Sequence, residues 1–249
     1  MDSVTQARNV RSRPPARSAP PQAQVACSVC AFNPLCHSRS APSGAPSPVE
    51  VRRRLARGEA LYRAGSPHSA IYAVRAGFLK SCVQGVGGAS HVVRLVLPGD
   101  VVGLDGYASG WHQAEAVALG DCELCEIPAY RAEILSDFNP RIGAHLRRLI
   151  ARELTEAREH AVALASLDIR QRVGRFLVDL GRRWLERGYS ANAFVLPMSR
   201  RDIAAHLALT PESLSRVLAH FQQRSWIRLD KRHLEILDAD ALKGAVPAS

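Results

Sequence analysis

The sequence lacks a long apolar run, and this absence limits where the chain can work. No stretch of about 18 unbroken apolar residues occurs in its 249 residues, so no membrane-spanning helix is predicted. The N-terminus is rich in Arg and Pro and lacks the apolar centre of a secretory signal peptide. We therefore expect a cytoplasmic protein without a membrane partner.

Motifs of common enzyme chemistry are also missing. The sequence contains no phosphate-binding glycine loop, no nucleophile elbow and no pair of carboxylates with the spacing of an acid–base pair. We therefore expect that the protein is not an enzyme and that its function is binding.

Acidic residues are fewer than basic ones, 23 against 33, which gives a net charge of +10. The excess is uneven: residues 1–57 carry +7, residues 58–167 carry −2 and residues 168–249 carry +5. A near-neutral middle between two basic ends favours a polyanionic partner such as nucleic acid. Charge alone does not separate such a partner from simple solubility.

Cysteine is sparse but unevenly placed. Cys27, Cys30 and Cys36 form a C-x2-C-x5-C cluster. Disulfides are a poor explanation for such a cluster in a reducing cytoplasm, which leaves a metal site or a redox site. The later cysteines are Cys82, Cys122 and Cys125.

The order of sequence patterns predicts an α+β protein. Glycine-punctuated apolar runs, at residues 70–75, 78–83, 91–97 and 122–127, predict an antiparallel β-barrel of the jelly-roll type. The predicted regions are a disordered basic tail (1–24), a cysteine-rich segment (25–48), the barrel as sensor domain (49–138), a long dimerisation helix (139–167) and a winged helix-turn-helix domain (168–249).

Apolar residues recur every three or four positions over residues 141–165, which predicts one long amphipathic helix. At 1.5 Å per residue, about 25 residues span about 37 Å. A narrow seam on such a helix suits a two-stranded coiled coil and therefore a homodimer. The alternative is a helix packed on its own barrel. The seam residues are Ile142, Leu146, Ile150, Leu154, Ala157, Ala161 and Leu164.

Residues 199–221 carry the most specific pattern in the chain, a helix-turn-helix. Leu209 falls in the turn, Thr210 can cap the second helix, and Pro211 suits its first turn, where a missing N–H costs nothing. Asp168 is expected to cap the preceding helix in the same way. Residues 226–237 suit a small hairpin, which completes a winged helix-turn-helix that binds double-stranded DNA.

The second helix of this motif is expected to read bases in the major groove. Arg216 can hold guanine O6 and N7, Glu212 can accept from cytosine N4, and Ser215 can serve a base edge or a phosphate. The candidates for contacts with the DNA backbone are Arg200, Arg201, Ser213, Arg224, Lys231 and Arg232.

A glycine-rich barrel, a long helix and a C-terminal helix-turn-helix together resemble the CRP/FNR family of bacterial regulators over about residues 51–242. The motifs Glu212-x-x-Ser215-Arg216 and Leu124-Cys125-Glu126-Ile127-Pro128 resemble the oxygen-sensing FNR branch. The resemblance implies TTGAT-like half-sites, RNA polymerase as a partner, and activation under anaerobic conditions. It also implies a [4Fe–4S] cluster on four thiolates, lost in oxygen, with these ligands: Cys27, Cys30, Cys36 and Cys125.

Two features qualify the resemblance. Cyclic-nucleotide members carry an Arg-Ser phosphate clamp, but residues 103–117 contain no Arg, so cyclic AMP is not the expected effector. Cys122 precedes Cys125 by three residues, which leaves the fourth ligand slightly ambiguous, although Cys82 and Cys122 are better explained as buried apolar residues. Structural zinc and a thiol–disulfide switch remain alternatives for the cysteines. An iron–sulfur enzyme would leave the helix-turn-helix without a role.

Overall fold

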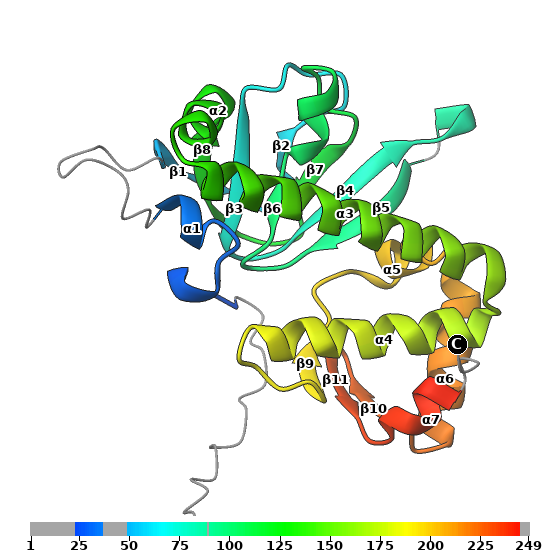
Figure 1. The fold of residues 1–249 in the computed structure, drawn as a ribbon. Coiled ribbons are helices and arrows are strands. Elements are labelled where there is room, and N and C mark those ends of the chain that lie inside the picture. Colours follow the sequence, from blue (N-terminus) through cyan, green and yellow to red (C-terminus); the bar gives the residue numbers. More distant parts are fainter. Residues whose placement is uncertain (1–22, 37–48, 89, 245–249) are drawn as a thin grey trace, which may run out of the picture.

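The structure, a computed structural model, describes residues 23–36, 49–88 and 90–244. In it, a barrel of strands and a helical domain lie on either side of two neighbouring long helices (Figure 1). The predicted disordered tail lies outside the described residues except for Ala23 and Gln24. Both are ordered: Ala23 is fully buried and Gln24 forms a β-bridge with Ala76. The packed chain therefore begins earlier than predicted, and the domain bounds stay a prediction.

Two four-stranded antiparallel sheets form the predicted barrel, in the orders β1-β8-β3-β6 and β2-β7-β4-β5. The strands are β1 (Val51–Leu55), β2 (Ala60–Tyr62), β3 (Ala70–Ala76), β4 (Leu79–Gln84), β5 (Ser90–Val96), β6 (Val101–Val102), β7 (Glu115–Ala118) and β8 (Cys122–Pro128). Short helical turns are η1 (Cys27–Val29), η2 (Val86–Gly88) and η3 (Leu104–Ala108), and α1 (Asn33–Cys36) lies beside the barrel. The four strands expected from the sequence are confirmed to within one or two residues.

The long helix is confirmed as α3 (Pro140–Ser166), which follows α2 (Ala129–Phe138). Asn139 starts α3 by accepting a hydrogen bond from the Arg141 N–H, and Pro140 occupies the first turn. No helix in the described ranges is both long and apolar enough to cross a membrane.

The apolar seam of α3 divides between two environments. Ile142 and Leu146 are buried in the chain's own core, beside Ile71 and Ile127, as the alternative prediction had it. Leu164 is half-buried. The middle of the seam stays exposed in the single chain, at Ile150, Leu154, Ala157 and Ala161.

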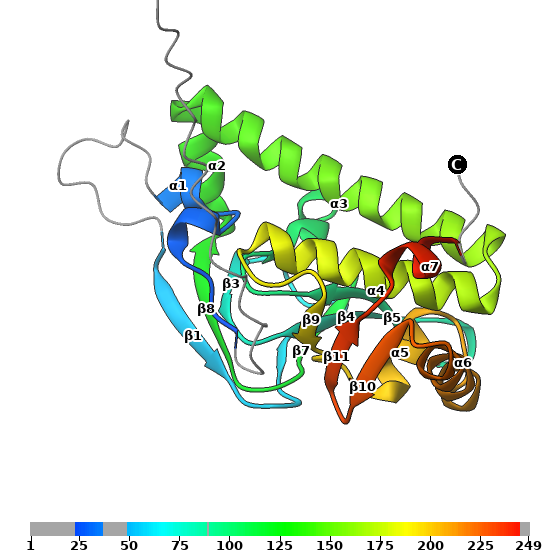
Figure 2. The ribbon, with the colours of Figure 1, turned by 90° about the horizontal axis from the view of Figure 1, so that it is seen from below.

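After α3 the chain turns back, so that α4 (Ile169–Glu186) runs beside it (Figures 1 and 2). Asp168 forms a capping box with Gln171, which confirms the predicted start of α4. The remaining elements are β9 (Ala193–Val195), α5 (Arg200–His206), α6 (Pro211–Gln223), β10 (Ile227–Asp230), β11 (His233–Ile236) and α7 (Ala239–Gly244). The hairpin β10–β11 is the predicted one, and β9 joins it as a third strand.

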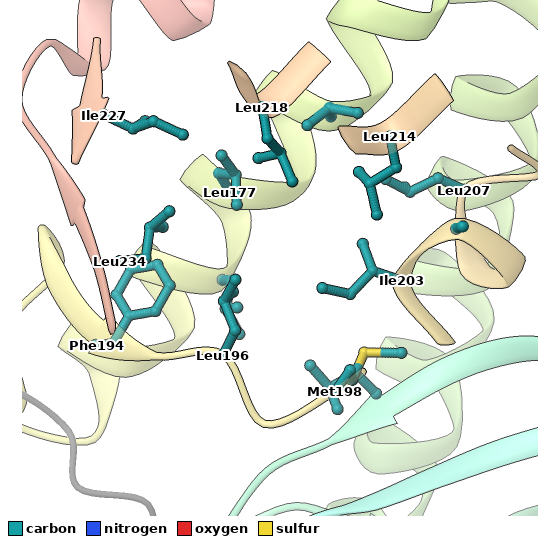
Figure 3. Packing of buried hydrophobic residues seen from close by; sticks show 14 of the residues in the cluster. Leu177, Phe194, Leu196, Met198, Ile203, Leu207, Leu214, Leu218, Ile227 and Leu234 are labelled. Carbon is teal, nitrogen blue, oxygen red and sulfur yellow. The ribbon is translucent and has the colours of Figure 1, made fainter. Parts of the chain in front are cut away.

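One apolar cluster fills the C-terminal domain and continues into the barrel. Figure 3 shows its centre, where Leu177 of α4, Ile203 of α5 and Leu214 of α6 converge. On the barrel side, Phe78 packs edge-on against Trp184 of α4, with ring centroids 5.7 Å apart. The barrel and the C-terminal domain therefore contribute residues to one continuous apolar core.

Candidate DNA interface and cysteine site

The turn between α5 and α6 is fixed by local hydrogen bonds. Leu209 donates from its N–H to the Ala204 carbonyl at 2.8 Å, and Ala208 takes a left-handed conformation with φ 53°. Thr210 Oγ1 accepts from the Ser213 N–H at 3.1 Å, which confirms the predicted cap of α6. The cap of α5, Ser199, was not predicted, although its capping box with Asp202 is legible as Ser-x-x-Asp.

The three candidate base-reading residues lie together on the exposed side of α6. Glu212, Ser215 and Arg216 are all exposed, while the opposite side of the helix is buried in the core. The backbone N–H at the start of α6 and the Thr210 hydroxyl lower the pKa of the Glu212 carboxyl, so it is an anion ready to accept a hydrogen bond. Ser215 already donates to the Pro211 carbonyl at 2.8 Å, which leaves its oxygen free to accept.

The candidate backbone contacts are not equally available. Arg201, Arg224 and Lys231 are exposed. Arg232 is exposed but donates to the Pro197 carbonyl at 3.4 Å, and Ser213 is half-buried beside the cap. Arg200 is half-buried, and burial lowers the pKa of its guanidinium. Within the described residues its Nη1 is buried without a hydrogen-bond partner, so Arg200 is the weakest of these candidates.

Four cysteines gather where the N-terminal segment meets the barrel. Cys125 lies on β8 opposite Arg52 of β1 and Ala73 of β3. Cys27 begins η1, Cys30 follows it and Cys36 ends α1, and both Cys30 and Cys36 pack against the same apolar cluster as Cys125. The Cys36 thiol lies close enough to the other three cysteines for their charges to raise its pKa; these are Cys30, Cys125 and Cys27. Cys27 is exposed, whereas the other three are half-buried.

Burial in apolar surroundings favours the neutral thiol at Cys30, Cys36 and Cys125. Burial raises the pKa of Cys30 to about 11 and that of Cys36 to about 12, with the neighbouring cysteines adding to both shifts. Phe32 and Leu35, between them in sequence, are buried in the same apolar cluster. Metal binding requires deprotonated thiols, and the positive charge of a metal centre would offset the free-energy cost of ionising these buried groups.

The remaining cysteines are elsewhere. Cys82 and Cys122 are buried, and the Cys122 thiol donates to the Phe78 and Gly120 carbonyls at 3.2 Å each. The structure thus separates Cys122 from Cys125, since alternate positions of β8 face opposite sides. In the described part of the chain, no three His, Cys, Asp or Glu side chains converge in a way that would hold a single metal ion.

A cavity of about 360 Å³ lies between the barrel, α3 and the start of the C-terminal domain. Asp105 is anchored at its edge, where Oδ2 accepts from the backbone N–H groups of Gln113 at 2.7 Å and Ala114 at 3.1 Å. Arg94 crosses from β5 to α3 and pairs with Glu153 at 3.2 Å. The carboxylates of Asp105 and Glu153 therefore already occupy the N–H groups and the arginine that could otherwise bind an anionic ligand in this cavity.

Two family models match the chain: residues 52–135 match the cyclic nucleotide-binding domain, and residues 171–245 match the Crp-like helix-turn-helix domain. The transcriptional regulatory protein btr of Bordetella pertussis is 34% identical over 225 residues, covering 87% of this chain and 91% of the relative. The transcriptional activator protein anr of Pseudomonas aeruginosa is 35% identical over 220 residues, covering 87% and 90%. The solved structure of FixK2 from Bradyrhizobium japonicum is similar, with a TM-score of 0.74, 27% identity, and coverage of 80% of this chain and 98% of that one.

Proposed function

Since this chain belongs to the CRP/FNR family of transcription regulators, we propose that it is an oxygen-responsive member that binds a palindromic operator as a dimer while a [4Fe–4S] cluster is intact. The observation that carries the proposal is that Cys27, Cys30 and Cys36, close in sequence, lie near the distant Cys125. All of them except the exposed Cys27 pack against one apolar cluster. RNA polymerase is the further partner that the family resemblance implies.

DNA reading is assigned to the exposed side of α6. In a dimer, two such helices enter successive major grooves about one helical turn apart. Arg216 is assigned to guanine and Glu212 to cytosine N4, with Ser215 accepting from a base or bridging to a phosphate. TTGAT-like half-sites are the operator that the resemblance of this helix to the FNR branch implies.

The four cysteines would hold the cluster, which when bound supplies the sensitivity to oxygen. A cluster spreads its thiolates over several iron atoms, whereas zinc needs all four sulfurs at about 2.3 Å from one point. No three ligand side chains among the described residues are arranged around one metal ion, so the resemblance to the FNR branch is what favours a cluster over zinc. Phe32 and Leu35 exclude water from the inner side of the site.

The cysteine segment is also tied to the dimerisation helix. His145 of α3 forms a hydrogen bond with the Ala31 carbonyl at 2.7 Å, through its Nε2. Release of the segment would remove this contact and expose Cys30 and Cys36 with their apolar neighbours. We infer that the first turns of α3 are then held less firmly, which weakens the dimer and hence operator binding.

A cyclic nucleotide is not part of the proposal. Its phosphate would need free N–H groups and a cation, but Asp105 occupies the amides of Gln113 and Ala114, and Arg94 is paired with Glu153. Binding would have to break these contacts.

Iron, acid-labile sulfide and visible absorbance of the anaerobically purified protein test the proposal. We expect about four irons and four sulfides per chain, with absorbance that bleaches in air and operator binding that is lost with it. Cys125→Ser should abolish iron retention, whereas Cys122→Ala, on the same strand, should leave it unchanged. Stoichiometric zinc without a visible band, or a reversible disulfide without metal, would refute the cluster and leave DNA binding intact.

A further inference from the structure

The turn formed by residues 98–100 contacts the cysteine segment on one side. The Ala31 N–H donates to the Gly99 carbonyl at 3.0 Å. Gly99 has φ +93°, and a Cβ at this position would lie 3.4 Å from the Val29 carbonyl oxygen. The positive φ is a conformation that glycine takes without the strain a side chain would bring.

The same turn contacts α4 of the DNA-binding domain on its other side. The Asp100 carboxylate accepts from Arg183 at 2.5 Å and from Arg187. Arg187 also donates from Nε to the Pro98 carbonyl at 2.6 Å, and Arg183 donates to the Leu95 carbonyl at 3.0 Å. The three charged side chains are only 8–12% exposed, so water screens these bonds little.

Two arginines share one carboxylate at this junction. Burial alone would raise the pKa of the Asp100 carboxyl, but Arg183, Arg187 and Arg94, together with the Leu97 N–H, lower it to about 2. The carboxylate is therefore ionised at every physiological pH, and the junction is permanently charged.

A second contact joins the same two regions directly. The Tyr189 hydroxyl, just after α4, donates to the Gln24 carbonyl at 2.7 Å. Ala23, next to Gln24, is buried in the cluster that contains Phe78 and Trp184. Chain immediately before the first cysteine is therefore packed against the DNA-binding domain.

We propose that the 98–100 turn couples the position of the cysteine segment to that of the DNA-binding domain within one protomer, through Asp100, Arg183 and Arg187. This route does not pass through the dimerisation helix. The proposed coupling depends on the proposed function only in one respect, namely that the state of the cluster is the signal that moves the cysteine segment. Displacement of the segment removes the partner of the Gly99 carbonyl, while the Gly99 N–H still donates to the Val74 carbonyl at 2.7 Å, and the turn then holds Arg183 and Arg187 less firmly. Coupling is reciprocal, so loosening α4 must also loosen the cysteine segment.

Hydrogen–deuterium exchange on the reduced, metal-free full chain tests this reciprocity without needing any cluster. Arg187→Gln should speed exchange in residues 23–36, where Val25 and Ala31 donate to the barrel, by about fivefold or more, the lower end of usual coupling strengths. Arg182→Gln is the matched control, because Arg182 of the same helix pairs with Asp179 and Glu186 of its own helix. The control should leave the segment unchanged.

Faster exchange in α4 with unchanged exchange in residues 23–36 would overturn the coupling. If Arg187→Gln also speeds exchange in β4 and β7, the protein is destabilised as a whole. In that case Arg187→Lys, which keeps the charge beside Asp100, replaces Arg187→Gln, and exchange in residues 23–36 is again compared with exchange in β4 and β7.

Cluster-loaded protein provides the second measurement. The ratio of operator affinities with and without metal should fall about fivefold in Arg187→Gln, while the dimer mass in sedimentation stays unchanged. A failure to load iron would refute the proposed function but not the coupling, which the metal-free experiment tests alone.

Discussion

Replacement of Asp100 by Asn tests how much the charged junction contributes to stability. The substitution keeps the size of the side chain but leaves Arg183 and Arg187 buried without a counter-charge. Breaking a buried pair by removing one partner costs about 3–5 kcal/mol, mostly because the remaining charge is uncompensated. We expect a loss of this size at pH 7 in urea unfolding, read from the midpoint at a constant m-value.

The pH dependence gives an independent check. The pKa of Asp100 is lowered from 3.8 to about 2, so its ionisation stabilises the folded state above pH 3.8, and this contribution disappears as the pH falls towards 2. The shift corresponds to about 2 kcal/mol. The stability difference between the natural chain and Asp100→Asn should therefore shrink by about 2 kcal/mol over that interval.

Asp179→Asn is the control, because Asp179 also pairs with an arginine of α4 but at the surface, at 2.7 Å. Exposed pairs contribute about 0–1 kcal/mol. Equal losses for Asp100→Asn and Asp179→Asn at pH 7 would show that the desolvation of the buried charges cancels their attraction. The reasoning about the junction would then be wrong.

The remaining predictions concern DNA reading and assembly. In a fluorescence anisotropy titration, Arg216→Ala should cost about 1–3 kcal/mol of binding free energy on a specific operator and little on random DNA. Arg201→Ala should weaken binding to both DNAs equally and lower the slope of log affinity against log salt concentration by about one. Equal losses of affinity on both DNAs for Arg216→Ala would contradict base reading. Leu154→Glu should yield monomers in sedimentation without unfolding them, because Leu154 is 49% exposed. Leu146→Ala, at a seam position buried in the chain's own core, should instead cost about 2–5 kcal/mol of stability; a Leu154→Glu variant that stays dimeric would place the interface elsewhere.

Elements with strong local signals could be predicted from the sequence. The capping residues Asp168 and Thr210 and the periodic apolar residues fixed α3, α4 and α6 because these signals act within a few residues. Strand β1 was missed because its sequence, Val-Arg-Arg-Arg-Leu, looks like a charged loop. It forms an edge strand by pairing with β8, more than 60 residues later, and four of its five residues are exposed. Helix α2 was missed although Tyr130, Ile134 and Phe138 recur at helical spacing over ten residues; in the structure these three are exposed, and the buried residues of the helix are the small Ala129 and Ala132.

The candidate site was predictable only in part for the same reason. The spacing of Cys27, Cys30 and Cys36 is local, but the inclusion of Cys125 came from a family resemblance, and its place beside the other three depends on the register of β8. The sequence Pro-Gly-Asp at residues 98–100 is typical of a turn. The partners of Asp100 lie 83 and 87 residues later in the sequence, so no local pattern shows that this turn joins two domains.

The division of the α3 seam shows how one periodic pattern can serve two purposes. Apolar periodicity indicates that one face of a helix is buried, but it does not identify the element or partner chain that buries it. Here the first turns, at Ile142 and Leu146, are covered by the barrel and lie beside His145, which holds the cysteine segment. The following turns, at Ile150 and Leu154, remain available to a partner. Because a continuous helix is stiff, a change in how its first turns are held would alter the direction of the exposed part. We therefore propose that the cysteine segment acts on assembly through α3 as well as on α4 through the 98–100 turn.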